Sequence, residues 1–182
     1  LELAGLRRGE HFEAQQAFKG EDGQRMLPDF VIFLPQDKHI VIDSKVSLVD
    51  YERAITAEDD SERTQSLAAH AAAVKRHIDQ LSEKDYANLA GLQSPDFVLM
   101  FMPVEPAYIE IMRTQRDLFN YGYRKNVILV SHTTLMPILR TVANLWMVER
   151  SNAEARDISD RAGDIFNACL LYTSDAADDD RS

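Results

Sequence analysis

Cysteine is almost absent from the sequence, and no hydrophobic run is long. Cys169 is the only cysteine among 182 residues, so disulfides cannot hold the fold, which is typical of an intracellular protein. The most apolar stretch, residues 97–109, is interrupted by Pro103, Glu105 and Pro106. It falls short of the roughly 18 to 20 apolar residues that a membrane-spanning helix needs. We therefore expect a cytoplasmic domain without membrane contact.

An initiator methionine and a signal-peptide pattern are also missing. The chain opens with LELAGLRRGE, which has the pattern of an interrupted helix, so we expect an internal fragment of a longer protein. Its residues are 45% hydrophobic and 27% charged. This composition and length suit one globular domain with a substantial core.

The last residues differ from the rest of the chain. Residues 169–178, CLLYTSDAAD, look like the conceptual translation of a transposon-type sequencing adapter, and they follow a helical pattern without a stop signal. On this interpretation residues 1–168 form the domain, and residues 169–182 are a disordered tail that makes no core contacts. The alternative is a genuine acidic tail.

Positive charge is scarce, because 20 Lys and Arg residues stand against 30 Asp and Glu residues, for a formal net charge of −10. This acidity argues against a large nonspecific nucleic-acid surface. It does not exclude a metal-dependent nuclease, whose site is itself built from carboxylates.

Apolar runs and helical periodicity alternate along the chain. We expect strands at residues 11–18, 27–34, 39–46, 97–102 and 126–130. We expect helices at residues 48–57, 61–83 and 134–150, with a further helix between the last two strands. The last two strands are apolar on both faces, so they should share a sheet with the 39–46 strand and be covered by helices on both sides. This pattern predicts an α/β fold.

Three charged side chains lie inside the apolar segment PDFVIFLPQDKHIVIDSK: Asp29, Asp43 and Lys45. Alternate side chains of a strand point to the same face, so Asp43 and Lys45 should lie together. A hairpin between the two strands would bring Asp29 opposite Asp43. The segment therefore predicts two carboxylates and one ammonium group at one place.

Two interpretations of this cluster stay open. In the first, Mg²⁺ or Mn²⁺ is held by Asp29, Asp43 and the carbonyl oxygen of Ser44, while Lys45 acts on the attacking water or the phosphate. In the second, Asp43 and Lys45 form a structural ion pair and Asp29 belongs to a turn.

The two histidines of the 61–83 helix, His70 and His77, are expected at the surface.

Long segments of the chain resemble the RmuC family of bacterial DNA recombination proteins. The resemblance is carried by residues 7–60, 84–108 and 126–146, which include PDFVIFLPQDKHIVIDSK, SPDFVLMFMPVEPAY and NVILVSHTTL, and it extends over nearly all of residues 1–168. It implies a core of the restriction-endonuclease type, a mixed sheet flanked by helices, with a PD-(D/E)xK nuclease site. Asp29, Asp43 and Lys45 fall on the acid, acid and lysine positions of that site.

The resemblance further implies DNA as the substrate and a role in limiting rearrangement between short inverted repeats. One departure concerns the Trp-Gly-Glu of the family's first helix, which this chain lacks; Glu13 is our candidate for the third acid of the site. The alternative function is a non-catalytic DNA-associated scaffold with a degenerate site. Family members often carry an upstream coiled coil and a membrane anchor, so the full-length protein could form homo-oligomers.

Overall fold

The computed structural model describes residues 1–15, 17–19, 25–44, 47–84, 86 and 97–179. Side chains are described in these ranges apart from residues 18–19, 25–26, 160 and 162–179. The chain divides into two units, Leu1–Ala143 and Asn144–Ser182, and each is described by itself.

Strands and helices alternate after an initial group of strands. The strands are β1 (Phe12–Ala14), β2 (Phe18–Lys19), β3 (Arg25–Met26), β4 (Phe30–Phe33), β5 (His39–Asp43), β6 (Val98–Met102) and β7 (Val127–Ser131). The helices are the short 3₁₀ helix η1 (Glu2–Ala4), α1 (Val49–Thr56), α2 (Asp60–Glu83), α3 (Glu105–Thr114), α4 (Arg116–Arg124) and α5 (His132–Asp179). The predicted α/β fold is therefore confirmed.

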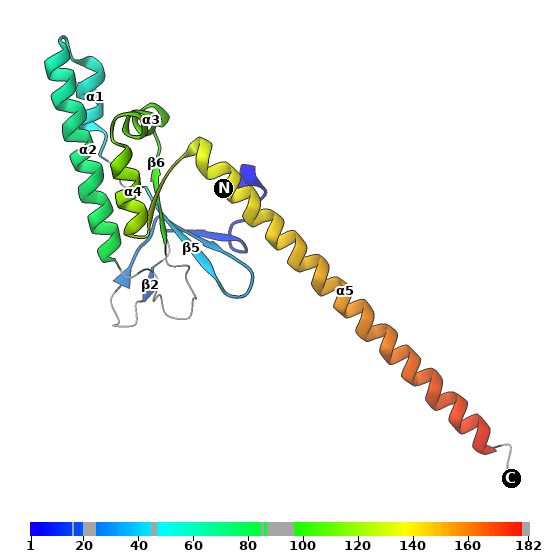
Figure 1. The fold of residues 1–182 in the computed structure, drawn as a ribbon. Coiled ribbons are helices and arrows are strands. Elements are labelled where there is room, and N and C mark those ends of the chain that lie inside the picture. Colours follow the sequence, from blue (N-terminus) through cyan, green and yellow to red (C-terminus); the bar gives the residue numbers. More distant parts are fainter. Residues whose placement is uncertain (16, 20–24, 45–46, 85, 87–96, 180–182) are drawn as a thin grey trace. The chain divides into compact units, whose positions relative to one another are not determined.

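Five strands form one mixed sheet in the order β1-β4-β5-β6-β7 (Figure 1). Strand β4 is antiparallel to both of its neighbours, β1 and β5. Strands β5, β6 and β7 are parallel to one another. Parallel strands need crossover connections, which α1 with α2 and α3 with α4 supply here. The apolar runs at residues 97–102 and 126–130, which form β6 and β7, thus lie in the same sheet as β5, as the sequence predicts.

Two segments differ from the sequence-based expectation. The strand expected at residues 11–18 is divided into β1, which belongs to the main sheet, and β2, which pairs with β3 in a separate two-stranded sheet; residues 16 and 20–24 lie outside the described residues. Helix α5 extends to Asp179, far beyond residue 150. It therefore continues as helix into the segment that we expected to be disordered. Because side chains from residue 162 onward are not described, the absence of core contacts there stays a prediction.

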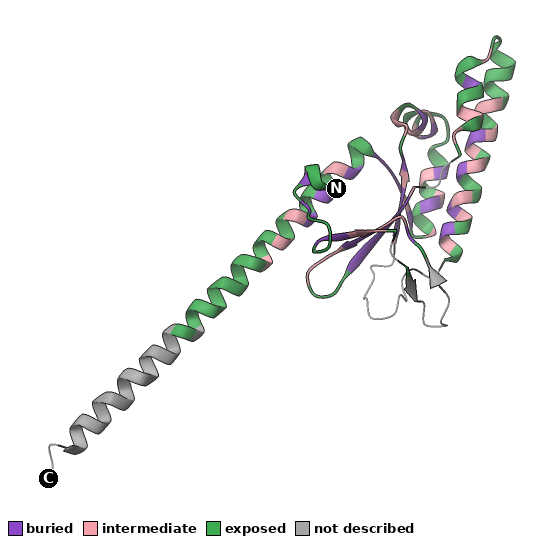
Figure 2. Cartoon of the chain, turned by 180° about the vertical axis from the view of Figure 1, so that it is seen from behind, coloured by how far each residue is buried: buried purple, intermediate pink, exposed green. Residues whose placement is uncertain are grey.

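The main core lies between one face of the sheet and helices α2, α3 and α4. Figure 1 shows α1 to α4 on one side of the sheet and the start of α5 on the other, where Leu135, Leu139 and Val142 are buried. Figure 2 shows buried residues along the strands and on the inner sides of α2 and α4. The buried residues of this core are Val31, Val41, Val74, Ile78, Leu81, Tyr86, Val98, Met100, Met102, Ala107, Ile111, Leu118, Val127 and Leu129.

Helix α2 begins at a side-chain cap, because Asp59 accepts a hydrogen bond of 2.8 Å from the backbone N–H of Glu62. Its buried residues are His70, Val74, Ile78 and Leu81. The prediction of a surface position for His70 is wrong, because its imidazole is buried with its ring centroid 5.7 Å from that of Tyr51 in α1. A single histidine on an amphipathic helix gives no signal that separates a buried position from an exposed one.

A polar cluster joins α2 to α4. The carboxylate of Asp79 accepts a hydrogen bond from the hydroxyl of Tyr121 and pairs with Lys125 at 2.9 Å and Lys75 at 3.4 Å. The Tyr121 hydroxyl, followed by Lys125, lowers the pKa of Asp79 to about 2. These contacts fix the side of α2 that faces α4.

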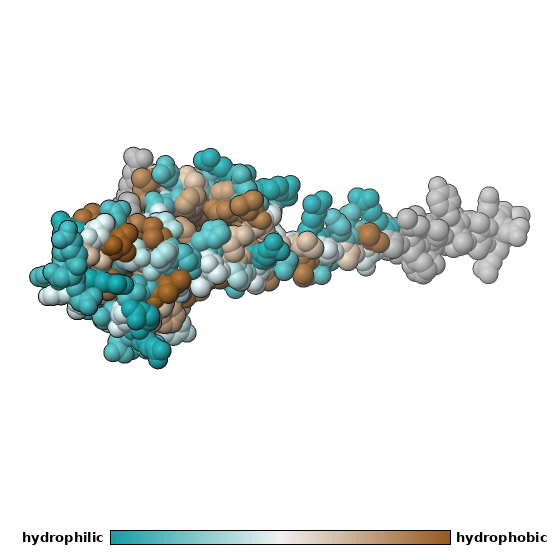
Figure 3. All heavy atoms as spheres, turned by 90° about the horizontal axis from the view of Figure 1, so that it is seen from above, coloured by the Kyte–Doolittle hydropathy of each residue, from teal (hydrophilic) through white to brown (hydrophobic). Residues whose placement is uncertain are grey.

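The second unit continues α5 from Asn144. Its described side chains are mostly exposed and include the large apolar Leu145, Met147, Val148 and Ile158. No helix within the described residues is both long enough and apolar enough to cross a membrane. On the face shown in Figure 3, apolar side chains lie in several separate areas among hydrophilic ones.

The hairpin between β4 and β5 closes through a tight turn. The backbone N–H of Leu34 donates to the carbonyl of Lys38 over 2.7 Å, and Gln36 and Asp37 have left-handed backbone angles, with φ of 64° and 58°. The hairpin expected between these two strands is confirmed.

Gly122 of α4 packs directly on β7. A Cβ atom at this position would lie 2.7 Å from the carbonyl oxygen of Val127 and 2.9 Å from Cδ1 of Leu129. We expect Gly122→Ala to lower the free energy of unfolding by about 1 to 3 kcal/mol, because α4 must move away from the strand. Urea denaturation measures this, with the exposed Asn120→Ala in the same helix as a control that changes stability by less than about 0.5 kcal/mol.

Burial lowers the pKa of His70, although the charge of Asp50 and the backbone of Ser47 oppose this effect. Below about pH 6.5, His70 therefore binds a proton in the unfolded chain but stays neutral in the folded chain. The free energy of unfolding should fall as the pH drops through this value. We expect His70→Leu to flatten the decline in unfolding free energy between pH 7.5 and 5. The exposed His132→Gln is the control, and an equally steep decline in His70→Leu would contradict this assignment.

Candidate functional site

Asp43 is the last residue of β5, and its side chain is only 1% exposed. It pairs in register with Met100 and lies two residues from Val41, both of which belong to the main core. The strand period thus points the carboxylate at the helices that cover this face of the sheet. An ionised carboxylate at such a position needs cationic or hydrogen-bonding partners.

The C-terminal part of α2 and the residues after it supply partners for Asp43. Nε2 of His77 lies 3.3 Å from Oδ2, and Nζ of Lys84 lies 3.4 Å from Oδ1. The hydroxyl of Tyr86 donates to the same Oδ1 over 3.4 Å. The surface position expected for His77 is wrong, since its side chain is 13% exposed and faces the carboxylate. The expected partner Lys45 lies outside the described residues.

These contacts change the proton affinities of Lys84 and Tyr86. Burial opposes the charge on Lys84, but its hydrogen bond to Tyr86 and the charge of Asp43 outweigh this effect and raise its pKa. Burial is also the first cause that raises the pKa of Tyr86, and Asp43 adds to it. Both groups therefore carry their protons at neutral pH and present donors to the carboxylate.

Asp29 lies beside the backbone that follows Asp43. Its Oδ2 accepts hydrogen bonds of 2.8 Å from both the backbone N–H and the hydroxyl of Ser44. Phe30 pairs with Ile42 in the β4–β5 ladder, and the same register extended by one residue puts Asp29 opposite Asp43. The structure thus brings these three predicted residues to one end of the hairpin.

Glu13 lies farther along the same face. It pairs with Val31 on the neighbouring strand, whereas Asp29 is two residues away from Val31. Directly opposite residues share a face, and diagonal neighbours are about 7 to 8 Å apart. Glu13 is therefore near Asp29 without a contact to it among the described residues.

Mg²⁺ is held in many proteins by one or two carboxylates together with water and substrate phosphate. Asp29 and Asp43 satisfy this minimum, because they supply hard oxygen donors at the start of β4 and at the end of β5. No group of three or more His, Cys, Asp or Glu side chains suited to a metal ion occurs among the described residues. The donor set fits a Mg²⁺ ion that keeps most of its water ligands better than a fully protein-bound metal.

Sequence reasoning missed Lys84 and Tyr86 and misplaced His77. These residues are 34 to 43 positions from Asp43 along the chain. His77 and Lys84 are seven residues apart, which is two helical turns, so their spacing on α2 could have shown that they share a side. It could not have shown which strand they face.

A second polar group joins the ends of β6 and β7. Glu105, the first residue of α3, accepts hydrogen bonds from the buried hydroxyl of Ser131 over 2.9 Å and from the N–H of Thr133 over 3.3 Å. Burial opposes ionisation, but these two donors lower the pKa of Glu105. Helix α5 begins at His132, two residues before the expected start at residue 134, and Glu105 satisfies an N–H group at its first turn.

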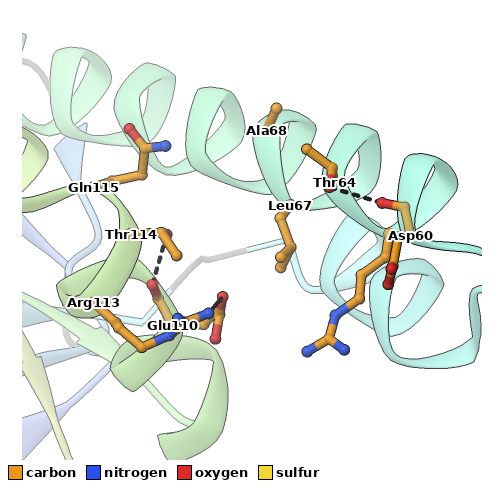
Figure 4. A pocket seen from close by; sticks show the side chains of 9 residues that line it. Asp60, Thr64, Leu67, Ala68, Glu110, Arg113, Thr114 and Gln115 are labelled. Carbon is orange, nitrogen blue, oxygen red and sulfur yellow. Dashed lines mark hydrogen bonds and ion pairs between the residues drawn. The ribbon is translucent and has the colours of Figure 1, made fainter.

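A separate open pocket lies between α2 and the end of α3 (Figure 4). Its volume is about 640 Å³, and Arg63, Leu67, Glu110 and Arg113 are among the residues that line it. Arg113 pairs with Glu110 at 2.7 Å. None of the predicted site residues lines this pocket.

A family model described as the RmuC family matches residues 1–179. The chain belongs to the RmuC family. It is 64% identical over 172 residues to the DNA recombination protein RmuC homolog of Pasteurella multocida. It is 59% identical over 171 residues to the protein of the same name from Haemophilus influenzae. It is 44% identical over 175 residues to DNA recombination protein RmuC of Escherichia coli.

These alignments cover 94% to 96% of this chain but only 34% to 38% of the RmuC relatives. The chain thus spans about a third of their length. No solved structure matches it. The family resemblance expected from the sequence is confirmed, whereas the restriction-endonuclease type of the core is compatible with the observed mixed sheet and stays a prediction.

The contacts of Asp29 predict its contribution to stability. We expect Asp29→Ala to lower the free energy of unfolding by about 1 to 3 kcal/mol in the absence of divalent cations, because the half-buried N–H of Ser44 loses its acceptor. Ser44→Ala removes only the hydroxyl and should cost about 0.5 to 1.5 kcal/mol. Chemical denaturation of both variants decides the point, and a more stable Asp29→Ala would show that carboxylate repulsion dominates there.

Proposed function

We propose that this domain acts on DNA in recombination as a Mg²⁺-dependent nuclease that hydrolyses phosphodiester bonds. The names of its RmuC relatives supply the process, DNA recombination. The observation that carries the chemistry is the buried carboxylate of Asp43 at the end of β5, with Asp29 held beside it through Ser44. The biological effect that we propose is to limit rearrangement between short inverted repeats.

In this proposal Asp29 and Asp43 hold the metal ion, with the carbonyl oxygen of Ser44 as a further ligand. Both hydrogen bonds from Ser44 end on Oδ2 of Asp29, so Oδ1 is the atom that we assign to the cation. A bound Mg²⁺ or Mn²⁺ would lower the pKa of a water molecule and offset charge on the phosphate. Lys45 would orient that water or stabilise the developing negative charge, and Glu13 would complete the acidic face.

The second candidate is a non-catalytic DNA-associated scaffold, and one observation favours it. His77, Lys84 and Tyr86 already surround the carboxylate of Asp43. Such a network can hold the end of α2 on the sheet without any metal. Cytoplasmic location and homo-oligomers formed through an upstream coiled coil belong to either proposal.

A cleavage assay on a full-length RmuC-family protein with this domain separates the two candidates. With branched and hairpin DNA and Mg²⁺, we expect Asp43→Asn to lower the cleavage rate by about 100-fold or more, the size typical of losing one group that stabilises a transition state. Asp29→Asn should act in the same direction. The exposed Asp117→Asn removes a carboxylate from α4 and is the matched control.

Thermal unfolding adds a reading that does not depend on activity. On the nuclease proposal Mg²⁺ raises the Tm of the parent protein and not that of Asp43→Asn. If the parent binds DNA, neither cleaves it nor responds to Mg²⁺, and loses about 3 to 5 kcal/mol of stability on Asp43→Asn, the scaffold is correct instead.

A further inference from the structure

Lys84 occupies an unusual position at the candidate site. It is the C-terminal cap residue of α2, and its Nζ lies 3.4 Å from Oδ1 of Asp43 and 3.1 Å from the hydroxyl of Tyr86. A positive charge at the C-terminus of a helix is also favoured by the helix dipole. The ammonium group of Lys84 thus interacts with the Asp43 carboxylate, the hydroxyl oxygen of Tyr86 and the negative end of the α2 dipole.

The contact between Lys84 and Asp43 is loose. Hydrogen bonds between an ammonium and a carboxylate are usually about 2.7 to 2.9 Å long, whereas this one is 3.4 Å. The side chain of Lys84 is 40% exposed, but that of Asp43 is 1% exposed. Lys84 can therefore leave the carboxylate for solvent without opening the core, while Asp43 cannot follow it.

A divalent cation and the ammonium of Lys84 compete for the same oxygen. Nζ of Lys84 lies 3.4 Å from Oδ1 of Asp43, and a Mg²⁺ ion bound to the same oxygen would lie about 2.0 to 2.1 Å from it, so the two cations would be at most about 5.5 Å apart. The two positive charges would repel each other strongly at such a distance. Binding of the cation would therefore favour movement of Lys84 away from Asp43.

We propose that Lys84 is an exchangeable counter-ion, which neutralises Asp43 in the metal-free domain and turns to a phosphate of the DNA backbone when a divalent cation binds. This inference rests on the proposed function. Lys84 suits both tasks, because an ammonium on a four-carbon stem acts as a mobile point charge. It also explains how a buried carboxylate can stay paired before the metal arrives.

Calorimetric titration of the chain with Mn²⁺, without DNA, tests the exchange. Lys84→Met keeps the length of the side chain and removes its charge. We expect it to raise the Mn²⁺ affinity at least about fivefold, since even a water-screened unit charge about 4 Å away opposes binding by that factor. Lys84→Arg should stay within about twofold of the parent, because Arg keeps the charge.

Lys75→Met is the matched control, because Lys75 also lies on α2 but pairs with Asp79. Its Mn²⁺ affinity should equal that of the parent. If the parent binds Mn²⁺ only when Asp43 is present, and Lys84→Met binds no more tightly, this inference fails while the proposed function survives. If the parent does not bind Mn²⁺, or Asp43→Asn binds it equally well, the proposed metal site itself fails.

Folding of Lys84→Met is checked by circular dichroism. A variant that folds only on addition of Mn²⁺ supports the exchange, because the cation then replaces the lost counter-ion. A variant that stays unfolded in saturating Mn²⁺ overturns it.

The phosphate contact is tested by DNA affinity in Ca²⁺, a divalent cation that we use to occupy the site. The slope of log K against log salt should fall by about 0.9 in Lys84→Met, the value for one lost phosphate contact. Without Ca²⁺ the parent and variant should have equal slopes. An unchanged slope in Ca²⁺ would show that Lys84 does not reach the backbone, and the proposal would be wrong.

Discussion

A carboxylate buried at the end of a central strand is the constraint on which this fold depends. The main core around β5 has a low dielectric, so the charge of Asp43 needs partners that carry opposite charge or donate hydrogen bonds. His77 and Lys84 come from α2, and the apolar stripe of the same helix packs on the neighbouring residues of the sheet. The contacts of His77 and Lys84 with Asp43 and the burial of the apolar residues of α2 therefore favour the same orientation of this helix.

The same constraint links stability to chemistry. If the ion pairs around Asp43 were only structural, the domain would gain little from them over an apolar side chain of similar size. The proposed metal site would give the charge of Asp43 a role that an apolar side chain cannot take. Among the described residues, Asp29 accepts its hydrogen bonds from Ser44 and not from a basic side chain.

Much of this arrangement could be predicted from the sequence, and the reasons are local. The strands around Val41, Met100 and Leu129 are short apolar runs, and the pairing of Asp29 with the Asp43 end of β5 follows from one hairpin. The partners His77 and Lys84 could not be predicted, because their placement depends on how α2 crosses the sheet. His70 was misplaced for a related reason, since a helix pattern with one polar member does not tell whether a second helix covers it.

The hairpin turn at Gln36 and Asp37 has a consequence for how the site can change. Its left-handed backbone sets the register in which Phe33 meets His39 and Phe30 meets Ile42. A shift of one residue in this register would send the side chain of Asp29 to the opposite face of the sheet, away from Asp43. The two carboxylates therefore stay together only while this hairpin keeps its register.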